Sequence, residues 1–128
     1  MKRHVTLGLA MVVSAALGAA AVETLHAQAK PPAYTIAQVN VKDPDGYKKD
    51  FLPVVMKGIE AAGAKYIVRG GKTESFSGEP PPNRVAVLQF ESLDKAKAWW
   101  KSPANQEANK IGEKYADFRV YAIEGLAE

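Results

Sequence analysis

The sequence predicts an α+β domain whose strands and helices follow the ferredoxin-like order β-α-β-β-α-β. Four runs have the β-branched and aromatic composition that is typical of strands, at 34–41, 65–69, 85–90 and 118–124. Apolar residues at helical spacing fill the stretches between the first and second runs and between the third and fourth. We therefore expect a four-stranded antiparallel sheet with helices on one face.

The first strand, 34–41, alternates in character from one residue to the next. One face carries mostly apolar residues and the other mixes polar and apolar groups: Thr35, Ala37, Val39 and Val41 against Tyr34, Ile36, Gln38 and Asn40. A mixed face of this kind is expected where a sheet meets a partner or a cavity.

The first helix is predicted to start at Asp43-Pro44, because an acidic cap followed by proline is a helix-start signal. Pro53 lies within the following apolar stripe and should kink the helix or divide it. Gly63 is expected to stop it. The stripe consists of Tyr47, Phe51, Val54, Val55, Ile59 and Ala62.

A hairpin is predicted for the middle of the chain. Its first arm, 65–69, is interrupted by Gly70-Gly71 and is expected to resume at 72–76, before the loop 77–83 leads into the strand 85–90. We interpret the two glycines as a bulge or bend, where a backbone without side chains can twist or be approached closely.

Two serines mark the second helical region. Ser92 is expected to cap one helix, and Ser102-Pro103 is expected to begin another that runs to about Tyr115. Trp99 and Trp100 are about 100° apart on a helix and cannot both face the core. One is expected to pack inside, and the other to line a cavity mouth or a dimer interface.

Residues 1–29 have the pattern of a cleavable secretory signal peptide. A basic start precedes an apolar stretch from Val5 to Val22, and Ala27-Gln28-Ala29 is an A-x-A cleavage site. The alternative is an uncleaved membrane anchor, since about 18 mostly apolar residues approach the length of a span. Cleavage would leave a short extended lead-in at 30–33 and one domain at 34–128. That product is expected in a bacterial periplasm, without stable membrane association.

The composition excludes several kinds of catalytic and metal-binding site. The chain has no cysteine, and both of its histidines lie within residues 1–29. The expected mature chain therefore lacks Cys and His nucleophile–base pairs, His-ligated zinc and haem ligands, and we expect neither a metal nor a cofactor. Removing Lys2, Arg3 and Glu23 from 17 basic and 14 acidic residues leaves 15 and 13, a near balance that argues against a nucleic-acid partner.

Several short motifs resemble those of a bacterial family whose domain has no known function, family 1330 of the domains of unknown function. The motifs are Ala33-Tyr34, Asp43-Pro44, Tyr47, Lys65-Tyr66, Val68-Arg69-Gly70-Gly71, Arg84, Trp100, Ser102-Pro103 and Glu124-Gly125. The family is part of the dimeric α/β-barrel superfamily. The resemblance covers essentially all of the expected mature chain and implies a ferredoxin-like fold and a homodimer whose two sheets face each other. It implies no particular reaction, since the superfamily includes cofactor-free monooxygenases, isomerases and haem enzymes.

Arg69 is the first candidate ligand-binding residue. An arginine at a strand bend, beside Gly70 and Gly71, can present its planar guanidinium to a carboxylate or phosphate, with backbone amides nearby. The alternative is a structural arginine that pairs with Asp43, Glu74 or an acid of a partner chain.

Tyr47, Tyr66, Arg84 and Trp100 complete the candidate binding set. The two tyrosines would supply hydroxyls to a pocket between the first helix and the sheet. The alternative is that their rings pack in the core and only their hydroxyls contact water. Arg84 is either a second cation near the open end of the hairpin or a solvated charge at a strand end.

No catalytic residue is assigned. Asp43 and Glu74 are the acids nominated for acid–base chemistry, although Asp43 also fits a helix cap. Three functions stay open: an exported homodimer that binds a small anionic or aromatic metabolite, a cofactor-independent enzyme of the monooxygenase or isomerase type, and a structural or envelope-stress dimer without a ligand.

Overall fold

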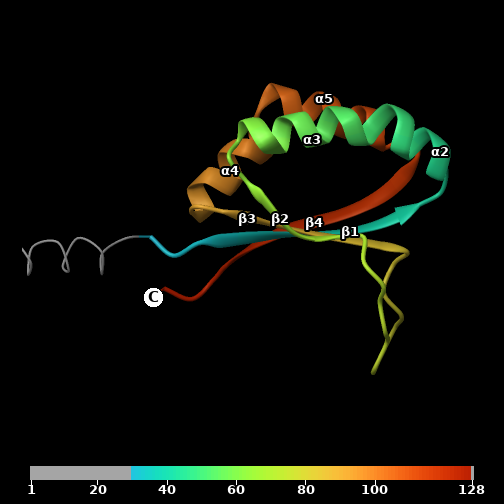
Figure 1. The fold of residues 1–128 in the computed structure, drawn as a ribbon, viewed down its shortest axis with the longest axis horizontal. Coiled ribbons are helices and arrows are strands. Elements are labelled where there is room, and N and C mark those ends of the chain that lie inside the picture. The colour runs from blue at the N-terminus through green and yellow to red at the C-terminus, as the bar shows by residue number, and fades with distance from the viewer. Residues whose placement is uncertain (1–29, 128) are drawn as a thin grey trace, which may run out of the picture. The chain divides into compact units, whose positions relative to one another are not determined.

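A four-stranded antiparallel sheet with helices on one face forms the fold of residues 30–127, the part of the chain that the computed structural model describes. The elements are β1 (Ala33–Val41), α2 (Pro44–Gly46), η1 (Tyr47–Phe51), α3 (Leu52–Ala61), β2 (Lys65–Arg69), β3 (Arg84–Phe90), α4 (Leu93–Lys101), α5 (Pro103–Gly112) and β4 (Ala116–Glu124). The strands lie in the order β2-β3-β1-β4, and Figure 1 shows the helices gathered on one side of them. The predicted ferredoxin-like order is confirmed.

The prediction of a signal peptide falls on residues 1–29, which lie outside the described residues. Within residues 30–127, no helix has the length and apolar character needed to cross a membrane.

β1 is a central strand, paired with β3 on one side and with β4 on the other. Its predicted alternation is confirmed, because Thr35 and Val39 are buried beneath the helices. Their neighbours, such as Ile36, point to the opposite side of the sheet. We call that side, which has no helix over it among the described elements, the open face.

The first helical segment begins and bends where the sequence predicts. The Asp43 carboxylate accepts a hydrogen bond from the Gly46 amide at 3.1 Å, as a helix cap does. The predicted break near Pro53 takes the form of the π-helical turn η1, in which the Leu52 amide donates to the Tyr47 carbonyl, five residues back. Pro53 has no amide hydrogen to continue a regular α-helical ladder across this point.

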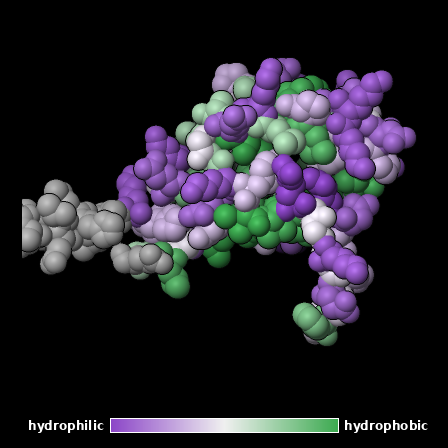
Figure 2. Space-filling model, viewed as in Figure 1, coloured by the Kyte–Doolittle hydropathy of each residue, from purple (hydrophilic) through white to green (hydrophobic). Residues whose placement is uncertain are grey.

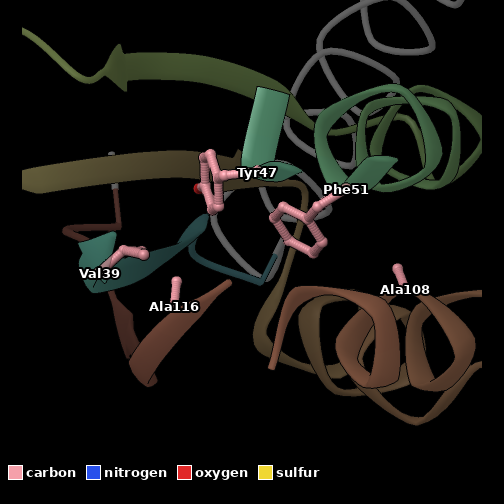
Figure 3. Close-up of a cluster of buried hydrophobic side chains, with 5 residues drawn as sticks. All are labelled: Val39, Tyr47, Phe51, Ala108 and Ala116. Carbon is pink, nitrogen blue, oxygen red and sulfur yellow. The ribbon is translucent and has the colours of Figure 1, made fainter. Parts of the chain in front are cut away.

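The buried core is divided into two clusters beneath the helices. Figure 3 shows the first, which brings together β1, η1, α5 and β4 through Val39, Tyr47, Phe51, Ala108 and Ala116. The second cluster joins α3, β3 and α4 through Ile59, Leu88, Phe90, Ala96 and Trp99. Each cluster thus ties both helical segments to the sheet by burying apolar surface.

The predicted second half of the first hairpin arm is wrong. Residues 72–76 form no strand, and the chain leaves the sheet after Arg69 at Gly70, whose φ is +65°. The bulge lies between Tyr66 and Val68 instead of at Gly70-Gly71. If the register of Arg69 with Ala86 continued, Pro80, Pro81 and Pro82 would stand opposite 73–75. Proline has no amide hydrogen, so this ladder cannot form.

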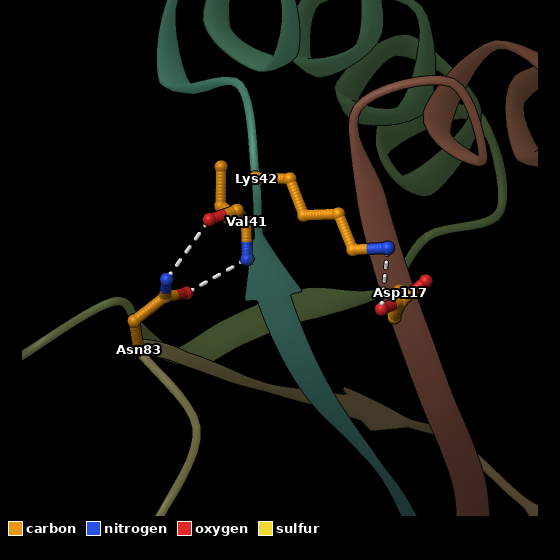
Figure 4. A network of polar contacts seen from close by, with 4 residues as sticks. All are labelled: Val41, Lys42, Asn83 and Asp117. Carbon is orange, nitrogen blue, oxygen red and sulfur yellow. Dashed lines mark hydrogen bonds and ion pairs between the residues drawn. The ribbon is translucent and has the colours of Figure 1, made fainter.

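Residues 70–83 therefore form an exposed segment, which we call the arm. Its far end is fixed to β1, as Figure 4 shows: the Asn83 side chain accepts from the Val41 amide at 2.8 Å and donates to the Val41 carbonyl at 3.0 Å. On the other side of this strand end, Lys42 and Asp117 form an ion pair at 3.0 Å.

The two serine caps are confirmed. Ser92 Oγ accepts from the Lys95 amide, and Ser102 Oγ accepts from the Asn105 amide, each at 3.2 Å. The helix α5 ends at Gly112, three residues before the predicted end, and β4 starts correspondingly early.

We expect Gly112→Ala to lower the free energy of unfolding by about 1–3 kcal/mol, since it overpacks the core. A Cβ atom there would lie 2.7 Å from a Phe51 ring carbon and 2.8 Å from one of Phe118. The matched control is Gly58→Ala on α3, which meets nothing within 4 Å. It should raise stability by up to about 1 kcal/mol because alanine favours helices. Urea unfolding measures both, and shifts in the same direction would contradict this account.

Candidate functional site

A cavity lies between the helices and the sheet, and we call it the inner cavity. Its volume of about 60 Å³ has room for a few water-sized groups. Aliphatic side chains from β1, α3 and β3 supply much of the wall. Its aromatic or hydrogen-bonding side chains include Tyr47, Tyr66, Arg84, Trp99, Trp100 and Asn105.

Three buried side-chain atoms within residues 30–127 have no hydrogen-bond partner in the chain: Arg84 Nε, Trp99 Nε1 and Asn105 Oδ1. All three residues line the inner cavity. Trp99 is 8% exposed and Asn105 is 3% exposed, so bulk solvent does not satisfy these atoms. A buried polar atom left unpaired costs about 1–3 kcal/mol. They belong to residues of β3, α4 and α5 that line one cavity, which makes this cavity the candidate site.

The Asn105 amide has a fixed orientation. Its Nδ2 donates to the Trp100 carbonyl at 3.0 Å, and its own backbone amide is held by the Ser102 cap. The unpaired atom is therefore the acceptor, Oδ1, whereas the unpaired atoms of Trp99 and Arg84 are donors. The residues that line the cavity thus carry two unpaired donors and one unpaired acceptor.

Arg84 is the cation of the inner cavity. Its Cζ lies 5.4 Å from the centroid of the Tyr47 ring, a cation–π distance. Burial raises the pKa of the Tyr47 hydroxyl, although the charge of Arg84 and a hydrogen bond from it act in the opposite direction. Burial likewise raises the pKa of Tyr66, against the charges of Arg69 and Arg84. Both hydroxyls therefore keep their protons at neutral pH.

Arg69 is exposed at the end of β2 and is not part of the cavity wall. Its Cζ lies 5.2 Å from the centroid of the Tyr66 ring. Within the described part of the chain it forms no ion pair with either proposed partner, Asp43 or Glu74. Of the two arginines named from the sequence, the structure brings Arg84 and not Arg69 to the cavity.

The two glycines after Arg69 have different roles. Gly70 has a positive φ, and a Cβ atom on it would lie 2.6 Å from Arg84 Nη1. The Arg84 side chain therefore passes directly over the Gly70 backbone on its way to Tyr47. Gly71 has ordinary backbone angles and open space around it. A glycine is thus required at Gly70, directly after β2, because the missing side chain makes room for Arg84.

The remaining candidates divide between the cavity and the surface. Trp100 is 38% exposed and lines both the inner cavity and the hollows outside it, beside β4. Asp43 and Glu74 are exposed, in a cap and in the arm, and neither lines the cavity. Within residues 30–127 no group of three or more acidic or other metal-ligating side chains gathers in a metal-binding arrangement.

Sequence reasoning missed Asn105 and assigned no polar role to Trp99. A signal for Asn105 exists in the spacing of α5, whose buried residues are Asn105, Ala108 and Gly112. A polar side chain on an otherwise small and apolar buried stripe is a candidate for a site, because a buried amide needs partners.

The fold and the cavity define a ferredoxin-like α+β protein with a small, largely apolar internal site. The family model described as a domain of unknown function (DUF1330) matches residues 32–126, and the chain therefore belongs to this family. The resemblance seen in the sequence motifs is confirmed. No curated protein matches the chain.

Solved structures with the same fold have low sequence identity to this chain. A protein of unknown function from Rhodopseudomonas palustris is 20% identical, with 83% of this chain and 92% of that chain covered and a TM-score of 0.54. A hypothetical Arabidopsis thaliana protein is 15% identical, with coverage of 78% and 93% and a TM-score of 0.58. A dimeric ferredoxin-like protein from Thermobifida fusca is 14% identical, with coverage of 74% and 92% and a TM-score of 0.47. The first two likenesses show the fold alone.

We expect Gly70→Ala to lower the free energy of unfolding by about 1–2 kcal/mol, because a residue with a Cβ atom is strained at this positive φ. The new methyl group would also displace Arg84. The neighbouring control, Gly71→Ala, should change stability by less than about 0.5 kcal/mol. Chemical denaturation compares the two, and equal effects would show that the approach of Arg84 to Gly70 is unimportant.

Proposed function

We propose that this protein binds a small anionic or aromatic molecule in the inner cavity. The observation that carries the proposal is the set of three unpaired buried atoms on Arg84, Trp99 and Asn105, residues that all line a single cavity. A few such atoms per hundred residues are usual in folded proteins, so the support is their location on residues of one cavity and not their number.

The chemistry of the wall favours a molecule with a negative group and a flat apolar body. The Arg84 guanidinium suits a carboxylate or a phosphate. Trp99 Nε1 donates a further hydrogen bond, and Asn105 Oδ1 accepts one from a hydroxyl or amine of the ligand. Around these groups the wall is mainly apolar and aromatic, as in most small-molecule sites.

A cofactor-independent enzyme is the second candidate, and the position of Tyr47 favours it. The Tyr47 hydroxyl lies on the cavity wall beside Arg84. Because burial raises its pKa, Tyr47 would serve as a proton donor and not as a base at neutral pH. Asp43 and Glu74 are not on this wall, so acid–base chemistry in the cavity would depend on the tyrosines.

We also propose that the chain acts as a homodimer joined through its open faces, after export directed by residues 1–29. The support for the dimer is an apolar row that crosses all four strands, formed by Val68, Val87, Ile36 and Tyr121. Tyr121 is 43% exposed, and Ile123 beside it on the same face is 54% exposed. An uncovered row of this kind is typical of a surface that meets a partner.

Native mass spectrometry of the gently purified protein, expressed as the full chain, tests the site. We expect an added mass on the wild type and its loss in Arg84→Gln, since the guanidinium is the anchor of the anion. The matched control is Arg69→Gln, which removes an exposed arginine outside the cavity and should retain the mass. Circular dichroism confirms that both variants are folded.

Two results would overturn the site. Retention of the mass in Arg84→Gln with loss in Arg69→Gln would move the ligand to the end of β2. Protein without added mass, and without thermal stabilisation by any of a panel of small carboxylates and phosphates, would favour the structural dimer without a ligand.

The dimer is tested by Ile123→Asp, which should raise the dimer dissociation constant about tenfold or more, because it places a charge in an apolar interface. The matched control is Val54→Asp on α3, which is 40% exposed on the helical side and should leave the constant unchanged. Sedimentation velocity at micromolar concentration measures both. A monomeric wild type would contradict the proposal.

A further inference from the structure

We propose that the arm of one copy reaches around a second copy of this chain and that Phe76 packs against it. This inference rests on the open-face homodimer proposed above and adds a second contact to it. The starting observation is Phe76, which is 93% exposed in the middle of an exposed segment. At this exposure the ring makes almost no packing contact within its own chain.

The base of the arm is firmly closed, so its direction is set by the sheet. At one end, the Gly70 amide donates to the Val85 carbonyl at 2.9 Å. At the other end, both polar atoms of the Asn83 amide bond the Val41 backbone. The proline triplet 80–82 restricts the returning half of the arm to extended backbone.

The arm leaves the sheet on the side away from the helices. Figure 1 shows it extending below the sheet while the helices of residues 30–127 lie above, and Figure 2 shows it standing clear of the rest of the surface. The arm is therefore on the same side as the open face, where a second sheet would pack.

The reach of the arm exceeds the spacing of two packed sheets. Each half of this segment, residues 70–83, can extend by about 20 Å at most. Two face-to-face sheets lie about 10 Å apart. An arm on this side therefore passes the edge of the second sheet and can place Phe76 against the body of the other copy.

Charge favours a second copy over a membrane as the partner. The arm carries Glu74 and Glu79 with a single base, Lys72. The open face carries the bases Lys65, opposite Gln89, and Arg119, opposite Gln38. Its acid Asp117, opposite Asn40, is neutralised by Lys42, so the face is basic. An acidic arm is attracted to a basic face of the same chain and is repelled by anionic lipid headgroups.

The test uses the fact that the chain contains no cysteine. Phe76→Cys introduces one thiol, which is labelled with a benzophenone maleimide and irradiated at micromolar protein concentration. We expect a product with the mass of two chains, whose crosslink maps to the second copy, and its loss in the Phe76→Cys, Ile123→Asp double variant. We also expect Phe76→Ser to raise the dimer dissociation constant about tenfold, as for an aromatic interface residue.

The outcomes separate the arm from the dimer. A wild type that sediments as a dimer but gives no two-chain product, with an unchanged dissociation constant in Phe76→Ser, overturns the arm and leaves the open-face dimer in place. A monomeric wild type overturns both. Labelled protein that is bound by anionic vesicles more tightly than the Phe76→Ser variant, without a two-chain product, assigns the arm to membranes and also overturns the proposal.

Discussion

The alternation of side chains along β1 determines which residues of the central strand face the helices and which form the open face. β1 pairs with β3 and β4, so its period of two residues is imposed on the middle of the sheet. Thr35 and Val39 face the helices and help to enclose the inner cavity. Ile36, between them, belongs to the apolar row on the open face. A shift of one residue in this register would exchange the residues that line the inner cavity with those of the open face.

Local signals made most of the fold predictable. The caps at Asp43, Ser92 and Ser102 each bond an amide three residues away, so the sequence around them contains all that the interaction needs. The break associated with Pro53 has an equally local cause, a missing amide hydrogen. Local signals could not show that the predicted strand at 72–76 would be absent. Its composition suits a strand, but the prolines that would stand opposite are about five to nine residues further along.

The candidate site was less predictable because its parts meet only in the folded chain. Arg69 and Arg84 each stand at an end of a predicted strand, and their roles depend on the bulge after Tyr66 and on the space above Gly70. The unpaired Asn105 Oδ1 can be recognised only once α4 and α5 are packed. In the folded chain Asn105 Nδ2 donates to the Trp100 carbonyl, and Oδ1 is left without a partner. Burial without a partner is a property of the tertiary structure.

The two tryptophans have a consequence for how this molecule can be observed. The chain contains two in all, and both are on the wall of the inner cavity. Their rings form an edge-to-face pair with centroids 5.9 Å apart, one shielded and one partly in water. All of the indole emission of the protein therefore originates at this wall. The intrinsic fluorescence of the chain therefore reports on the surroundings of the inner cavity without an added dye.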